Sequence, residues 1–138
     1  ADFDFFICKD GYSSLPVAGY CNYFGVKTIK KESDKLVTSS SLNGGWLMIS
    51  GVELGKQSPS ALELLVSSTV KGKLEIWLDD LKYGKLIATI QVSPTGGENN
   101  LKIFSKTVKN ITGHHDVFIK FPTGVESSIF IKSLRFVK

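Results

Sequence analysis

From residue 46 to its end, this chain alternates apolar and polar residues with a period of two. In "KLEIWLD" (73–79), Leu or Ile occupies every second position, and Glu75 and Trp77 stand between them. Successive side chains of a strand point to opposite faces, so this pattern predicts β-strands with one face toward a core. The same pattern recurs in six other segments: 46–50, 61–68, 86–93, 101–108, 115–121 and 128–137.

Turn-forming residues separate the predicted strands at intervals of about eight to twelve residues. They include "VKGK" (70–73), "PTGGENN" (94–100) and "PTGVESS" (122–128), and no segment shows a helical stripe over three turns. We therefore predict an all-β chain, a two-sheet antiparallel β-sandwich of the jelly-roll kind. A slip in the apolar phase between Ile131 and Leu134 predicts a bulge in the last strand.

The N-terminal third of the chain is less regular. Residues 1–16 are either an edge strand or an N-terminal extension or linker, and the sandwich itself is predicted over residues 17–138. Residues 27–45 are polar and rich in Ser, which is typical of a surface loop. The chain has 138 residues, 42% of them hydrophobic, so it can bury the core of one domain.

The charges and the cysteines limit the possible partners. The 17 Lys and Arg residues give a net charge of +4 but are scattered, so no nucleic-acid partner is expected. No apolar run approaches the roughly 20 residues of a membrane span, so no membrane partner is expected either. Cys8 and Cys21 form a disulfide or remain two free thiols, and the residues alone leave both alternatives open.

The titratable residues give no indication of an enzyme. A metal site here would use His114, His115 and Asp116 as ligands, but neighbours on a strand point to opposite faces, so the two imidazoles diverge instead of converging on one ion. We expect them to be strand-start residues held by local hydrogen bonds. Asp79 and Asp80 follow a strand, where they are expected to form a turn rather than an acid/base pair.

Three segments in order resemble a family 6 carbohydrate-binding module: "NGGWLMISGVELG" (43–55), "LEIWLDDLKYGKLIATIQVSPTGG" (74–97) and "GHHDVFIKF" (113–121). The resemblance covers about residues 17–138. It implies a non-catalytic jelly roll that binds a plant or algal polysaccharide, such as xylan or β-glucan, or its oligosaccharides. It also implies a covalently linked glycoside hydrolase and a secreted, extracellular location.

The usual sugar site of the resembled family lies in loops at one end of the sandwich. It uses two aromatic side chains and an Asn, and the matching positions here are Ser40, Glu98 and Phe130. Without two flat aromatic walls, that site should be disabled in its usual form. Glu98 and Asn99 either hydrogen-bond a sugar there or belong to a solvated turn.

The resemblance also implies a structural calcium ion, but its carboxylate ligands are missing. The chain has "VAGY" (17–20) and Lys132 at the matching positions, so no cofactor is expected, with a structural calcium ion as the alternative that stays open. Two alternatives remain for Lys132. Its ammonium group substitutes for the ion and satisfies the same carbonyls, or it is an exposed lysine at a sheet edge.

Some members of the resembled family bind sugar on the concave face of one sheet, through a Trp and a Glu that match Trp46 and Glu75. Trp77 has the same parity as Glu75, so we predict a carbohydrate-binding face that contains all three residues. The alternative is that residues 27–45 or a neighbouring catalytic domain covers the two indoles. The chain would then be a structural module that has lost sugar binding.

Overall fold

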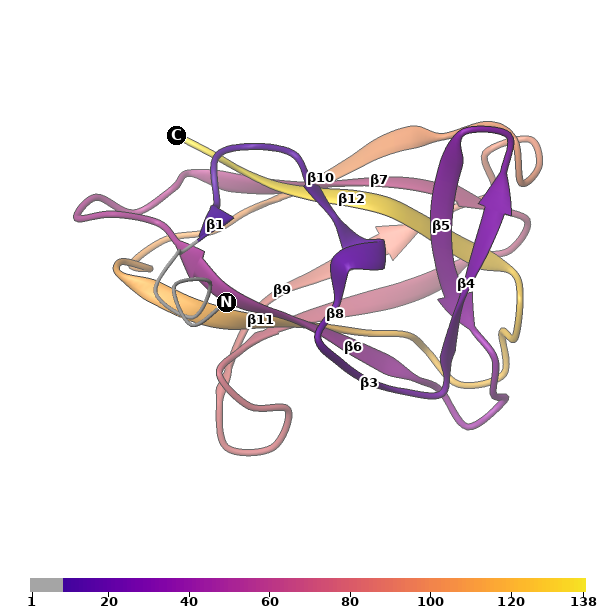
Figure 1. Cartoon of the computed structure of the whole chain (residues 1–138), viewed down its shortest axis with the longest axis horizontal. Helices are drawn as coiled ribbons and strands as arrows, with labels where there is room; N and C mark the ends of the chain where they lie inside the picture. The colour runs from indigo at the N-terminus through magenta and orange to yellow at the C-terminus, as the bar shows by residue number, and fades with distance from the viewer. Residues whose placement is uncertain (1–8) are drawn as a thin grey trace, which may run out of the picture.

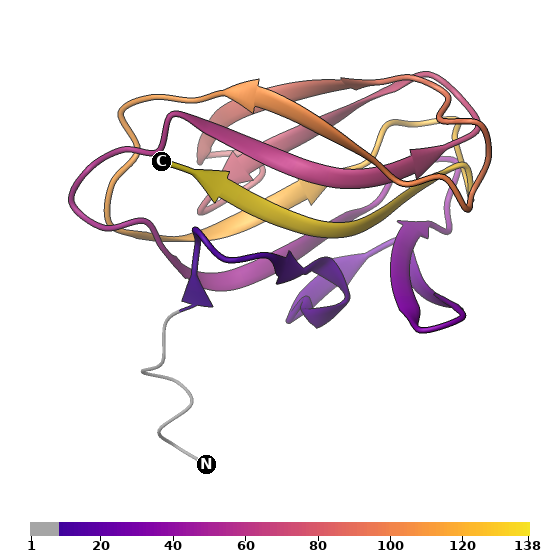
Figure 2. The same cartoon turned by 90° about the horizontal axis from the view of Figure 1, so that it is seen from above.

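The computed structural model describes residues 9–138, which fold into two facing sheets of six strands each (Figure 1, Figure 2). Sheet A contains β1 (Lys9–Asp10), β3 (Asn22–Phe24), β6 (Trp46–Glu53), β8 (Gly72–Leu78), β9 (Lys85–Val92) and β11 (His114–Lys120). Sheet B contains β2 (Leu15–Pro16), β4 (Val26–Lys31), β5 (Asp34–Ser39), β7 (Ala61–Ser68), β10 (Lys102–Thr107) and β12 (Ile129–Val137). Within residues 9–138, no helix is long and apolar enough to cross a membrane.

The strand order confirms the predicted antiparallel β-sandwich. Sheet A runs β1-β6-β11-β8-β9, with β3 also paired to β6, and sheet B runs β10-β7-β12-β5-β4, with β2 paired to β12. Every pairing is antiparallel except that of β1 with β6. The register of β12 against β7 shifts between Ile131 and Ser133, which confirms the predicted bulge.

The core lies between the two sheets, where the alternating apolar side chains meet. On β8, Leu74 and Ile76 are fully buried, whereas Glu75 and Trp77 between them are only half-buried. Each fully buried aliphatic side chain contributes about 1.5–3 kcal/mol through removal of apolar area from water. The period-two pattern therefore determines which face of each strand points inward and which face of sheet A stays open to solvent.

The prediction of a surface loop over residues 27–45 is wrong for residues 27–39, whereas residues 40–45 contain no strand. Residues 26–39 form the hairpin of β4 and β5, with Glu32 at the turn in a left-handed conformation (φ 55°), and β5 pairs with β12. β4 is an edge strand, and Lys and Thr make up most of it, with Val26 and Ile29 as its two apolar residues. Polar side chains on an edge strand protect it from further pairing, and they also hide its period-two pattern.

Residues 9–16 belong to the two sheets. Lys9–Asp10 pairs with β6, and Leu15–Pro16 pairs with β12, so the expected boundary at residue 17 falls inside the sandwich. This favours the edge-strand alternative for residues 9–16. Cys8 lies outside the described residues. The alternative of a disulfide between Cys8 and Cys21 therefore stays open.

Candidate functional site

The outer face of sheet A brings together three of the residues singled out in the sequence. Trp46 on β6 pairs with Lys120 on β11, and Lys120 pairs with Glu75 on β8. In the next row, Phe118 on β11 pairs with Trp77 on β8. Cross-strand partners point to the same face, so all five side chains stand on this surface. Lys120 is exposed, and the other four are half-buried.

Four aromatic residues cross this face from strand to strand, and we call them the aromatic strip: Phe24, Trp46, Phe118 and Trp77. The Trp46 and Phe118 ring centroids lie 5.7 Å apart with the rings tilted by 53°. Phe24 pairs with Trp46 and is 62% exposed. Three steps between neighbouring strands of about 4.8 Å make the strip roughly 14 Å long. An apolar surface of this length suits the faces of consecutive sugar rings.

Two members of the aromatic strip were not singled out in the sequence. Phe118 follows from the alternation in "HDVFIKF", because it stands between the buried Val117 and Ile119. Phe24 belongs to a strand of three exposed residues, and so short a segment shows no period.

A hydrogen bond fixes the carboxylate of the face against one of its indoles. Trp77 Nε1–H donates to Glu75 Oε1 at 2.9 Å. The two residues are i and i+2 on one strand, so their side chains share a face and meet there. One carboxylate oxygen thus orients the indole, and the other remains available as an acceptor for a ligand hydroxyl.

The loop after Trp77 is also held by a carboxylate. Asp80 Oδ2 accepts hydrogen bonds from the backbone N–H groups of Tyr83 at 2.6 Å and Lys82 at 2.8 Å, which confirms the expected turn. These two bonds lower the pKa of Asp80, with Tyr83 the larger cause. The loop projects from sheet A on the side away from sheet B, and Tyr83 on it is 83% exposed (Figure 1).

Glu98 and Asn99 lie apart from the aromatic strip. They border a groove of about 490 Å³ beside the β4–β5 turn, where Glu98 Oε2 accepts from Lys31 Nζ at 2.7 Å. Phe130, at a matching position of the family's loop site, is 2% exposed and pairs with Thr38. The structure therefore places none of Glu98, Asn99 and Phe130 beside Trp46 or Trp77.

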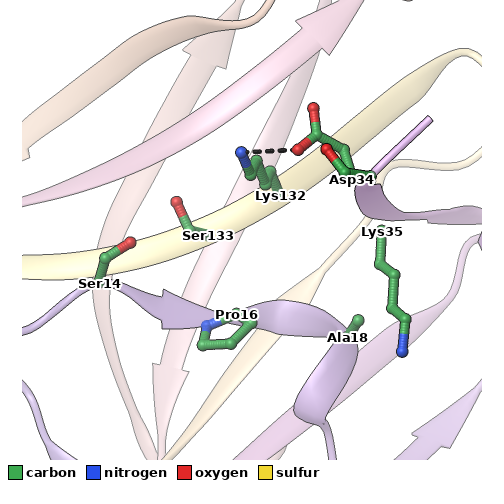
Figure 3. Close-up of a pocket in the computed structure, with 8 residues that line it drawn as sticks. Ser14, Pro16, Ala18, Asp34, Lys35, Lys132 and Ser133 are labelled. Atoms are coloured by element: carbon green, nitrogen blue, oxygen red, sulfur yellow. Dashed lines mark ion pairs between the residues drawn. The ribbon is translucent and has the colours of Figure 1, made fainter. Parts of the chain in front are cut away.

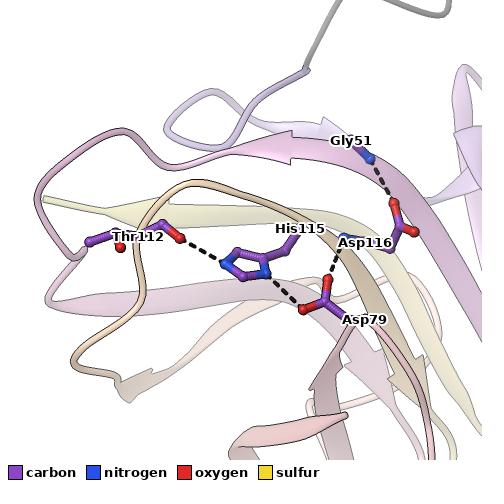
Figure 4. Close-up of polar contacts among 5 residues, drawn as sticks. All are labelled: Gly51, Asp79, Thr112, His115 and Asp116. Atoms are coloured by element: carbon purple, nitrogen blue, oxygen red, sulfur yellow. Dashed lines mark hydrogen bonds and ion pairs between the residues drawn. The ribbon is translucent and has the colours of Figure 1, made fainter.

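The histidine segment forms the local hydrogen-bonding network that was expected of strand-start residues (Figure 4). The His115 Nδ1 atom lies 2.9 Å from Asp79 Oδ2, and its Nε2 atom lies 2.8 Å from the Thr112 carbonyl oxygen. Asp116 Oδ1 accepts from the backbone N–H of Gly51 at 3.0 Å. These bonds tie the end of β8 to β11 and β6. No group of three or more His, Cys, Asp or Glu within residues 9–138 could hold a metal ion.

Residues near the expected calcium position do not fit that ion. Lys132 Nζ lies 2.9 Å from Asp34 Oδ1, in a pocket of about 330 Å³ that Pro16 and Ala18 also line (Figure 3). Calcium takes about six to eight oxygen ligands, and an ammonium group at this position repels a cation. The ionic partner of Lys132 is thus a carboxylate on the β4–β5 hairpin.

We expect calcium to leave the stability of the domain unchanged. The unfolding midpoint in millimolar calcium should agree with that in EDTA to within about 1 °C, because a specifically bound ion would raise it. Thermal unfolding followed by circular dichroism measures this. Tight calcium uptake in a calorimetric titration would contradict the expectation.

An open aromatic face on an antiparallel β-sandwich is a surface that the faces of sugar rings can contact. The model of the family described as "Carbohydrate binding module (family 6)" matches residues 18–138. The chain therefore belongs to carbohydrate-binding module family 6.

Relatives and solved structures agree with this membership. The chain is 34% identical over 83 residues to an arabinoxylan arabinofuranohydrolase of Bacillus subtilis, a match that covers 60% of this chain and 16% of that enzyme. A family 6 module from Clostridium cellulolyticum in complex with xylose superposes with a TM-score of 0.82 at 27% identity, over 94% of this chain and 100% of that one. A glycoside hydrolase family 43 arabinoxylan arabinofuranohydrolase from Bacillus subtilis in complex with cellotetraose superposes with a TM-score of 0.84 at 25% identity. The match covers 96% of this chain and 28% of that one.

Proposed function

We propose that this module binds a polysaccharide of the xylan or β-glucan kind on the outer face of sheet A. The observation that carries the proposal is the aromatic strip, with the Glu75 carboxylate fixed beside Trp77 at 2.9 Å. Flat rings contact the C–H faces of sugars, and a few oriented polar groups select their hydroxyls. No bond is made or broken, and the expected Kd is of order 10⁻⁵ to 10⁻³ M.

Both indoles are partly exposed to solvent, so a ligand can reach them. Trp46 and Trp77 are half-buried and lie outside the core between the sheets. Most of the segment 27–45, the alternative cover for the indoles, belongs instead to β4 and β5 of sheet B. The face therefore remains available to a ligand within the described part of the chain.

The relatives support a role in targeting an enzyme. The chain spans about a sixth of the arabinofuranohydrolase that it matches. We infer that it is joined to a secreted glycoside hydrolase and holds that enzyme on its polysaccharide. Tethering raises the effective concentration of a weak binder at the polymer, so a modest affinity is sufficient.

Affinity electrophoresis tests the proposal. The purified module should migrate more slowly in native gels cast with xylan or β-glucan than in gels without polysaccharide, and agar and pectin complete the panel. An unrelated protein of similar charge and size corrects for sieving by the polymer. Unchanged migration in every gel would instead support the alternative, a structural module that has lost sugar binding and packs against a catalytic domain.

A further inference from the structure

Lys120 stands on the central strand of the outer face of sheet A, at the end of that strand. Its strand, β11, is the central strand in the order β1-β6-β11-β8-β9, and Lys120 pairs with Trp46 on one side and Glu75 on the other. The side chain is exposed. A ligand that lies along the aromatic strip would therefore pass directly over or beside this ammonium group.

Lys120 forms no ion pair within the described part of the chain. None of the ion pairs among residues 9–138 involves Lys120 or Lys73. The nearest carboxylate in register, Glu75, accepts its hydrogen bond from the Trp77 indole instead.

A second lysine adds to the positive charge at this end of the face. Lys73 lies two residues before Glu75 on β8 and so points to the same face, and it is exposed. Its cross-strand partner on β9 is the uncharged Gln91. The cross-strand row of Lys120 contains Glu75, and the row of Lys73 contains Gln91. The two rows together thus hold two cations and one carboxylate, so their net charge is positive.

We propose that this face selects polysaccharides that carry uronic acid carboxylates. This inference rests on the proposed function, because the sugar rings must first lie on the aromatic strip. The carboxylate of a uronic acid then forms an ion pair with the Lys120 ammonium group, and Lys73 adds attraction from the next row.

A carboxylate is the group that this arrangement recognises best. An ammonium group has three donors and no acceptor, so it satisfies the acceptors of an anion. Hydrogen bonds between an ammonium group and a carboxylate are shorter and about twice as strong as neutral ones. A neutral polysaccharide can still lie on the aromatic strip, but it leaves the positive charge without a partner.

A matched pair of ligands tests this selectivity. Glucuronoxylan is compared with the same preparation after its carboxyl groups have been reduced to primary alcohols, so that only the charge differs. At low ionic strength the acidic form should bind about two- to fivefold more tightly by calorimetry, the range of a solvent-exposed ion pair. The difference should shrink in 0.5 M salt, where the screening length is only about 4 Å.

Lysine variants test whether the preference for the acidic form comes from this face. Lys120→Gln should reduce the preference for the acidic form to near one, and Lys73→Gln should reduce it in part. Lys106→Gln, on the exposed edge strand β10 of sheet B, makes the same change in net charge and should leave the preference intact. A melting curve for each variant confirms that it is folded.

Equal binding of both ligand forms by the wild-type module would overturn the charge selectivity and leave the proposed function standing. A preference that survives Lys120→Gln, or that is lost equally in Lys106→Gln, would overturn the role of this lysine. If the wild-type module binds neither form but is retarded by β-glucan, this inference is overturned and the proposed function stands. If it binds neither form and migrates unchanged in every gel, both are overturned.

Discussion

The variant that combines Trp46→Ala and Trp77→Ala is expected to bind at least about thirtyfold more weakly than the wild-type module. The ligand is the polysaccharide that slows the wild-type module most in affinity electrophoresis. Truncating a large aromatic side chain at the centre of a binding surface commonly costs about 2 kcal/mol or more, which is about thirtyfold. Removing both indoles deletes two of the four members of the aromatic strip. Isothermal titration calorimetry with a soluble oligosaccharide measures the loss.

The control for the tryptophan variant replaces an exposed apolar residue in the other sheet. Ile103 on β10 is 64% exposed, and Ile103→Ala should leave the affinity unchanged. Because both indoles are half-buried, the unfolding midpoints are compared as well, and Trp77→Leu retains apolar packing if the alanine variant is unstable. Binding that persists in a folded double variant would contradict the proposed site.

Gly45→Ala is expected to destabilise the domain by about 1–3 kcal/mol, the usual cost of forcing extra atoms into a closely packed place. A Cβ atom at Gly45 would overlap the carbonyl oxygen of Gly25 and would lie 2.9 Å from that of Phe24. These neighbours are backbone atoms, which cannot move as a flexible side chain does. The total stability of a small domain is only about 5–15 kcal/mol, so the loss should be evident in a urea titration.

Gly45→Ala should also weaken binding, because Gly45 positions the start of β6. Its carbonyl oxygen accepts from the Phe121 N–H at 2.7 Å, and Trp46 follows it directly. Gly19→Ala is the matched control, since a Cβ there meets nothing within 4 Å and should be near neutral. Equal stability of the two glycine variants would show that the contact at Gly45 is not tight.

Strands buried on one face could be predicted from the sequence alone. The alternation around Leu74 and Ile76 requires a strand, because no other regular element puts every second residue into a core. The same reasoning failed for residues 26–39. Most of β4 is exposed and residues 36–39 of β5 are all buried, so neither strand alternates in the sequence.

The candidate site could be predicted in part. Parity places Glu75 and Trp77 on one face of β8, and the family resemblance adds Trp46. The sequence gives no register between distant strands, and register is what places Lys120 between Trp46 and Glu75. Glu98 and Asn99 were included from the family pattern, yet they border a different groove, beside the β4–β5 turn.

The most direct test of the binding face is a titration of the ¹⁵N-labelled module with an oligosaccharide of the bound polymer, followed by nuclear magnetic resonance. The chain has two Trp residues, so two indole N–H signals report on the aromatic strip. We predict that both signals shift with the backbone signals of β8 and β11, while those of Glu98 and Asn99 remain in place. Shifts confined to the groove around Glu98 and Asn99, with both indole signals unmoved, would contradict this account.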